Sequence, residues 1–163
     1  MSVSALTIAL CGCATSVTLP AVSKGTLDPR AFFTGRTHGD GELDKLFSGR
    51  AKVTVDSVGR RQGDTLILDQ TILGDEKPPR HRRWTMTPVA PNRYSGTLTD
   101  ATGPVLVTVA GPRAYIRYTM KGGLQVEQQL ALQSNGRTIL NRLEVKKFGA
   151  RLATLNETIT KLD

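Results

Sequence analysis

Apolar and polar side chains alternate along short runs over most of this chain of 163 residues. Polar residues such as Lys52, Thr54 and Asp56 separate the apolar ones, and the same two-residue period recurs in later runs. The apolar positions of the clearest runs are Ala51, Val53 and Val55; Leu66, Leu68 and Ile72; Val126, Leu130 and Leu132; and Ala153, Leu155 and Ile159. A period of two with one wet face is typical of antiparallel strands, and it predicts an all-β domain.

Turn residues divide the chain at the intervals expected of strands. Glycine, proline and asparagine recur from Gly35 to Gly149, and the sequence SNGR at Ser134 to Arg137 is the clearest hairpin turn. About ten strand candidates follow one another through connections of roughly two to five residues. This succession predicts an antiparallel up-and-down β-barrel of about 8–10 strands, which removes the sheet edges and can enclose a ligand. A two-sheet sandwich is the alternative.

Both cysteines of the chain lie close to its start, at Cys11 and Cys13. A bridge between them would close a very small ring, and two thiolates are too few for a closed zinc site. The preceding run from Val3 to Leu10 is apolar but too short to span a bilayer, which is typical of the central part of a signal peptide. The four residues from Leu10 to Cys13 resemble the bacterial lipobox, whose final cysteine is acylated.

The lipobox resemblance implies that residues 1–12 are a signal peptide, that residues 13–30 are the lipidated Cys13 and its tether, and that residues 31–163 form the barrel. It implies a lipid-anchored protein of the bacterial cell envelope that faces the periplasm. Ala14, in place of the Asp associated with inner-membrane retention, favours the outer membrane. The alternative is that residues 1–20 form a short buried element with two inert cysteines.

The formal net charge is +8, from 22 Lys and Arg against 14 Asp and Glu. This charge favours acidic partners such as lipid headgroups or nucleic acid. Surfaces that bind nucleic acid usually set aromatic residues among basic ones, whereas one Trp, three Tyr and four Phe are scattered here. We therefore expect no nucleic-acid partner, and with a lipid anchor the basic surface is expected to face a membrane.

Four side chains of metal-binding types occur at every second position in the stretch THGDGELD. On a strand, His38, Asp40, Glu42 and Asp44 would share one face. Glycines at positions 39 and 41 are also what a bulged or sharply bent barrel strand needs, and the oxygen-rich pattern of a calcium loop is absent. We therefore expect a bend rather than a metal site, and no cofactor.

Motifs that carry catalysis are scarce. His38 and His81 are the two side chains suited to act as bases at neutral pH, and neither stands in a recognisable nucleophile pattern. The stretch DEKPPRHRRW, which ends at Trp84, combines a stiff Pro-Pro connection with basic residues that suit a membrane interface or an anionic headgroup. The scarcity of catalytic motifs favours a binding protein over an enzyme.

Longer stretches resemble a known family. FFTGRTHGDGEL opens the domain, LILDQTILGDE and RYSGTLTDATG follow, and RTILNRLEVKKFGARLATLNETITK closes it. From Phe32 to Lys161 this pattern is similar to uncharacterised bacterial lipoproteins catalogued as domain of unknown function three-eight-three-three. The resemblance implies a lipocalin-like, calycin-type barrel without an established reaction. At Glu127 to Leu130 the chain departs from the family, whose members usually carry an acidic pair followed by tryptophan.

These observations predict a lipid-anchored envelope protein that binds or carries an apolar or amphiphilic small molecule, such as a lipid or a fatty acyl chain. One alternative is an enzyme acting on a lipid or small substrate, in which Arg83, Asp69, Arg117 and Tyr118 converge; another is a structural protein with a filled barrel. The candidate ligand-binding residues are Leu68 (Ile67 in the other register), Asp69, Arg83, Trp84, Tyr94, Ile116, Arg117, Tyr118 and Leu132. A one-residue slip in register exchanges the inner and outer faces, so the sequence leaves open which of them face inward.

Overall fold

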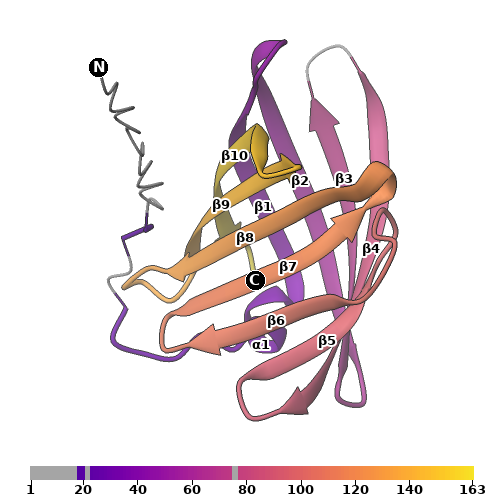
Figure 1. Cartoon of the computed structure of the whole chain (residues 1–163). Helices are drawn as coiled ribbons and strands as arrows, with labels where there is room; N and C mark the ends of the chain where they lie inside the picture. Colours follow the sequence, from indigo (N-terminus) through magenta and orange to yellow (C-terminus); the bar gives the residue numbers. More distant parts are fainter. Residues whose placement is uncertain (1–17, 21–22, 75–76) are drawn as a thin grey trace, which may run out of the picture.

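The computed structural model describes residues 18–20, 23–74 and 77–163, which form a closed barrel of ten strands (Figure 1). Each strand pairs with the next along the chain, and β1 pairs with β10 to close the sheet. The elements are α1 (Pro29–Phe33), β1 (Gly35–Lys45), β2 (Gly49–Gln62), β3 (Thr65–Gly74), β4 (Lys77–Ala90), β5 (Arg93–Leu98), β6 (Val105–Ala110), β7 (Arg113–Met120), η1 (Lys121–Gly123), β8 (Leu124–Leu132), β9 (Thr138–Lys147) and β10 (Ala150–Lys161). The predicted barrel is confirmed, and the sandwich alternative is wrong.

Alternate residues of each strand face the barrel interior, as the two-residue period predicts. In β6, Val105, Val107 and Val109 are buried, whereas the residues between them are exposed. Most of the buried apolar side chains form one cluster, which includes Phe32 and Phe33 of α1. The apolar core therefore lies toward the end of the barrel that α1 covers (Figure 1).

The short helix α1 is held in place at both of its ends. At its start, the Asp28 carboxylate accepts hydrogen bonds from the amides of Arg30 (2.9 Å) and Ala31 (3.4 Å), which is the usual role of an N-cap residue. At its end, the Lys161 ammonium on β10 donates to the carbonyl oxygens of Phe32 (2.9 Å) and Thr34. The last strand therefore fastens the helix that plugs the barrel.

Residues 18–20 lie on the outer wall of the barrel, bonded to β7, β8 and the turn after β8. The amide of Leu19 donates to Gln129 Oε1 (3.1 Å), and the Leu19 carbonyl accepts from Arg113 Nη2 (2.7 Å). The Pro20 carbonyl accepts from Gln133 Nε2 (3.1 Å). Residues 1–17, which include Cys13 and the predicted signal peptide, lie outside the described residues. Within the described part of the chain, no helix is long and apolar enough to cross a membrane.

The backbone of Gly59 on β2 lies so close to α1 that any side chain there would overlap the carbonyl oxygen of Phe33. Because the obstructing atom belongs to the backbone, no rotamer change relieves the overlap and the helix must shift. We expect Gly59→Ala to lower the free energy of unfolding by about 1–3 kcal/mol, measured by thermal unfolding followed by circular dichroism. Gly103→Ala is the control, since nothing lies within 4 Å of its added carbon. Equal melting temperatures for the two variants would contradict this account.

Candidate functional site

Polar side chains project into the barrel from β2, β3 and β4, beyond the apolar core. Gln70 links three of them. Its Oε1 accepts hydrogen bonds from Arg82 Nε (2.8 Å) and Trp84 Nε1 (2.6 Å), and its Nε2 donates to Ser57 Oγ (3.0 Å). One amide side chain thus fixes the orientation of a guanidinium, an indole and a hydroxyl group inside the barrel. We refer to these residues, together with Tyr118, Asn141 and Glu157, as the polar belt.

Arg82 places a positive charge inside the barrel, next to aromatic rings. Its guanidinium carbon lies 5.5 Å from the centre of the Trp84 ring, and Trp84 meets Tyr118 edge to face at 5.6 Å. Burial lowers the pKa of Arg82 and raises the pKa of the Tyr118 hydroxyl. Arginine nevertheless keeps its charge in proteins. The belt therefore offers a fixed cation beside a neutral phenol that can donate a hydrogen bond.

Glu157 and Asn141 face each other on β10 and β9 and are almost completely buried, with exposed fractions of 8% and 3%. Asn141 Nδ2 donates a hydrogen bond to Glu157 Oε2 at 2.7 Å. Burial is the main cause of the raised pKa of the Glu157 carboxyl, and it outweighs the opposing effects of Asn141 and the Arg82 charge. Within the described part of the chain, Thr37 Oγ1 and Asn141 Oδ1 have no hydrogen-bond partner. One buried oxygen on β1 and one on β9 are thus left without a hydrogen bond inside the barrel.

Two glycines of β1 make room for the Glu157 side chain. A side chain at Gly39 would overlap the Glu157 carboxylate, and one at Gly41 would press on Leu155 and on the backbone of β10. β1 pairs with both of its neighbours without a register shift. Neither ladder of β1 therefore contains a bulge, and the two glycines provide the space that the Glu157 side chain occupies.

A cavity of about 340 Å³ opens beyond the belt, toward the hairpin turns that lie away from α1. Its polar side chains are Lys45, Arg80, Arg82 and Tyr118. Its apolar lining residues are Leu43, Ala51, Val53, Val55, Ile72, Pro78, Met120, Leu143, Val145, Ala153 and Leu155. Among the described lining residues there is no carboxylate. The cavity is thus apolar along its walls and positively charged.

Six of the residues predicted to bind ligand face the interior. Tyr118 lines the cavity, whereas the other five pack in or against the apolar core. These five are Leu68, Trp84, Tyr94, Ile116 and Leu132. Trp84 still reaches the belt through its hydrogen bond to Gln70.

The other three predicted residues, Asp69, Arg83 and Arg117, lie on the outer wall. The Asp69 carboxylate is 2.5 Å from Arg83 Nε and 2.7 Å from Arg60 Nη1, and these bonds, chiefly that to Arg83, lower the pKa of Asp69 to about 2. The predicted convergence of these residues with Tyr118 is wrong. Arg117 and Tyr118 are adjacent in β7, and adjacent residues of a strand point to opposite faces.

The outer wall also carries the predicted metal-like stretch. His38 Nδ1 lies 2.6 Å from an Asp56 oxygen and Nε2 lies 3.3 Å from an Asp40 oxygen, and the bond to Asp56 is the main cause of the raised pKa of His38. Among the described residues, no group of three or more His, Cys, Asp or Glu side chains is placed to hold a metal ion. An open hollow of about 640 Å³ runs along this wall, where the charged groups pair with one another in solvent. This wall therefore offers less to a ligand than the cavity does.

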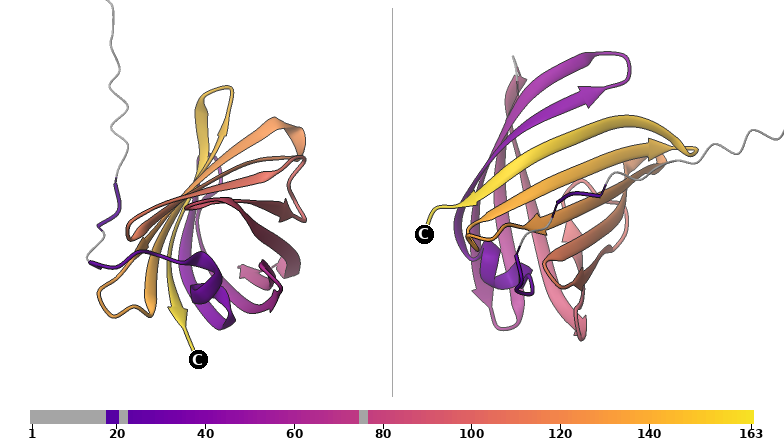
Figure 2. Two further views of the ribbon diagram at one scale, coloured as in Figure 1. Left: turned by 90° about the horizontal axis from the view of Figure 1, so that it is seen from below. Right: turned by 90° about the vertical axis from the view of Figure 1, so that its left-hand side faces the viewer.

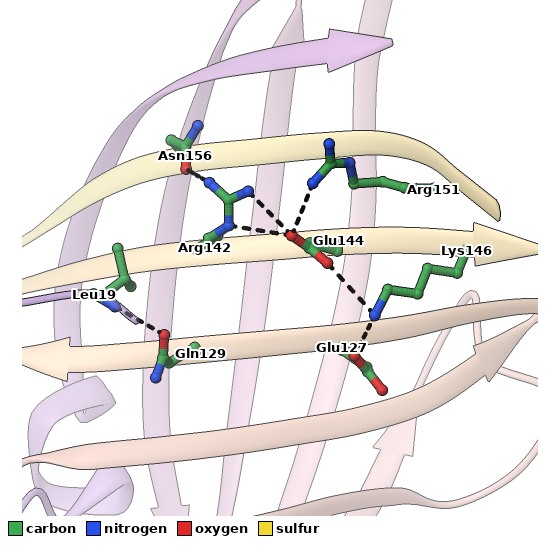
Figure 3. A network of polar contacts seen from close by, with 8 residues as sticks. All are labelled: Leu19, Glu127, Gln129, Arg142, Glu144, Lys146, Arg151 and Asn156. Atoms are coloured by element: carbon green, nitrogen blue, oxygen red, sulfur yellow. Dashed lines mark hydrogen bonds and ion pairs between the residues drawn. The ribbon is translucent and has the colours of Figure 1, made fainter. Parts of the chain in front are cut away.

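A second outer network joins β8, β9 and β10 (Figure 3). Glu144 accepts from Arg142 (3.1 Å) and lies 3.5 Å from Lys146, which also pairs with Glu127 at 2.6 Å. Glu127 belongs to the stretch that departs from the family pattern. It lies outside the barrel, so Glu127 itself contributes an ion pair rather than a cavity residue.

The sequence prediction missed Gln70, Arg82, Asn141 and Glu157. Two of them interrupt apolar series that face inward: Gln70 stands between Leu68 and Ile72, and Glu157 stands between Leu155 and Ile159. In the sequence, both are recognisable as polar residues at positions where the two-residue alternation calls for an apolar one.

Comparisons with known proteins give a family and a fold. A family model described as Protein of unknown function (DUF3833) matches residues 7–161. Among solved structures, an S-type phycobiliprotein lyase from Guillardia theta is similar, with a TM-score of 0.64 and 6% sequence identity, over 82% of this chain and 90% of that chain. At this identity the likeness shows the fold alone. No curated protein matches the chain in sequence.

The raised pKa of Glu157 predicts a pH dependence of stability. The folded state holds this proton to higher pH than the unfolded state does. The stabilisation is therefore complete below the unfolded pKa, about 4.3, and it is lost as the pH rises through the folded pKa. Glu157→Gln keeps an acceptor for Asn141 but does not titrate. We expect its melting temperature, relative to wild type, to be higher at pH 7 than at pH 4.

Glu42→Gln is the control for that experiment, because the Glu42 side chain is exposed on the outer face of β1. It is expected to keep the wild-type difference between the two pH values. A Glu157→Gln variant that also keeps this difference would show that the Glu157 carboxyl titrates normally in the folded protein.

Proposed function

We propose that this chain, which belongs to the DUF3833 family of proteins of unknown function, binds or carries an apolar or amphiphilic small molecule inside its barrel. The cavity carries this proposal. Its walls are apolar, and the charged side chains among its described lining residues, Lys45, Arg80 and Arg82, are all cations. A ligand with a hydrocarbon part and one anionic group, such as a fatty acid, matches both properties.

Each part of such a ligand would find a partner. The apolar walls stabilise a hydrocarbon chain by about 25 cal/mol per Å² buried, before the costs of binding. Arg82 and Tyr118 stand where the cavity meets the polar belt, so a carboxylate there would receive charge-assisted hydrogen bonds. The volume of about 340 Å³ falls within the range of roughly 300–1,000 Å³ that is usual for small-molecule sites.

The two alternative functions receive less support. A structural barrel filled by its own side chains does not account for the cavity. For an enzyme, the described lining residues provide no serine, threonine, cysteine, histidine or carboxylate, and Lys45 and Tyr118 are the lining groups of a type able to transfer a proton. The residues around the cavity favour binding over chemistry.

Displacement of a fluorescent fatty acid from the full chain tests the binding proposal. We expect Arg82→Met to weaken binding of a fatty acid by about tenfold or more, because it removes hydrogen bonds to a charged group. The same variant should bind the corresponding fatty alcohol as wild type does. Arg117→Met, on the outer wall, is the control and should bind both ligands normally. Absence of binding to wild type, or equal losses in both variants, would refute the proposal.

A second test asks whether the ligand occupies the cavity, and it does not depend on the charge of Arg82. Val53 lines the cavity wall on β2. Val53→Trp would fill part of the volume, so binding of both the fatty acid and the fatty alcohol should fall, with the fold checked by circular dichroism. Undiminished binding in Val53→Trp would place the ligand elsewhere.

The proposal includes a lipid anchor on Cys13 and a location in the bacterial envelope, facing the periplasm and on the outer membrane. The sequence from Leu10 to Ala14 supports it. The bonds of Leu19 and Pro20 to the outer wall are compatible with it, because they fix a point on the barrel from which a tether would begin.

Intact mass spectrometry of protein extracted from its native membrane tests the anchor. We expect a mature chain that begins at acylated Cys13. Cys13→Ser should remain unprocessed and lose the acyl mass, whereas Cys11→Ser, the matched control, should be processed normally. A wild-type chain that keeps residues 1–12 would refute the anchor and leave the binding proposal untouched.

A further inference from the structure

Three large apolar side chains project into solvent at the open end of the barrel. Leu46 and Phe47 lie in the turn between β1 and β2, with exposed fractions of 59% and 90%, and Phe148 lies in the turn between β9 and β10, with 96%. The two turns are neighbours, because the Leu46 amide donates a hydrogen bond to the Leu152 carbonyl at 3.0 Å. In the right-hand view of Figure 2 both hairpins, purple and yellow, extend away from the C-terminus. We call residues 45–50 and 147–151 the rim hairpins.

The backbone conformation at Phe148 sets this aromatic residue apart from ordinary exposed side chains. Phe148 has φ +51° and the following Gly149 has φ +80°, the combination found in tight two-residue hairpin turns. Asparagine, aspartate or glycine is favoured at the first of these positions, and a bulky residue there is uncommon. Phe148 therefore neither suits its turn nor packs in the core. Packing within the described part of the chain therefore does not account for an aromatic side chain at this position.

Basic side chains stand directly behind the exposed aromatic ones. Lys147 Nζ lies 5.5 Å from the centre of the Phe148 ring, and neither Lys147 nor Lys45 forms an ion pair within the described part of the chain. Arg50 is balanced by Glu42 and Asp44, and Arg151 shares the Glu144 carboxylate. The rim hairpins thus combine apolar tips with excess positive charge.

We infer that the rim hairpins dock on an anionic lipid membrane. Apolar tips backed by cations match a bilayer surface, where the rings enter the acyl boundary while the ammonium groups remain among acidic headgroups. A membrane also fits the geometry, because two separate convex tips form no groove for a peptide and no continuous basic track for nucleic acid. Lys45 belongs both to the rim and to the cavity lining. Docking would therefore bring the cavity to the membrane, a consequence that rests on the proposed function, whereas docking itself does not.

The test uses the full chain with a single tryptophan added at a rim tip. Phe47→Trp and Phe148→Trp are each mixed with vesicles of equal parts phosphatidylcholine and phosphatidylglycerol, in which the phosphatidylcholine carries brominated acyl chains that quench nearby indoles. Val89→Trp is the control, because Val89 is also exposed, at 63%, but lies near the opposite end of the barrel, before the turn from β4 to β5. Wild type supplies the background from buried Trp84. Because the readout depends on position, it is independent of any anchor at the N-terminus.

We expect strong quenching at positions 47 and 148, wild-type background at position 89, and quenching at the two tips about tenfold or more weaker in vesicles of brominated phosphatidylcholine alone. No quenching at the tips, equal quenching at position 89, or equal tip quenching in neutral vesicles would overturn the inference. Fatty-acid displacement measured on the same variants separates the two proposals. Lost quenching with normal displacement refutes docking alone, and normal quenching without displacement refutes the cavity function alone.

Discussion

Closing ten antiparallel strands into one sheet creates an interior wider than side chains alone fill, since about eight strands already leave a lumen of side-chain width. The layers inside this barrel follow from that constraint. α1 and its two phenylalanines occupy one end, the polar belt crosses the middle, and the other end remains hollow. A helix of five residues suffices as a plug because Asp28, Gly59 and Lys161 hold it from three sides. The cavity is thus the part of the barrel interior that neither α1 nor the side chains of the apolar core fill.

The polar belt works against the stability of the barrel. Burying a carboxyl group and a guanidinium costs free energy unless hydrogen bonds and opposite charges compensate. Gln70 and Asn141 provide part of that compensation, but burial still raises the pKa of Glu157 and Asn141 Oδ1 has no hydrogen-bond partner in the described part of the chain. Sequences that depart from the best core packing usually do so at functional sites. The polar belt therefore supports a functional site in this barrel as strongly as the cavity beside it does.

The fold was predictable from the sequence, but most of the site was not. Period-two alternation and frequent turns sufficed for an antiparallel barrel, because every ladder but one joins strands that are adjacent in the chain. Alternation alone does not say which face is inside, so Asp69 and Arg117 entered the prediction although both lie outside. Gln70 and Glu157 were overlooked because the prediction followed the apolar residues on either side of them and passed over the polar residue between. The role of Gly39 was beyond reach, since only the register places it against Glu157.

The pairing of β1 with β10 is the ladder that joins distant parts of the chain, and it has a consequence for how the protein folds. At this seam Arg36 bonds to Asp163, 127 positions away, whereas the other ladders arise from local hairpins. A chain that emerges from its N-terminus first can curl β1 to β9 into an open sheet, but it cannot close until the twelve residues of β10 appear. Until that moment the edge of β1 is unpaired and able to join strands of other molecules. The final strand therefore determines how long the newly made protein is prone to aggregate.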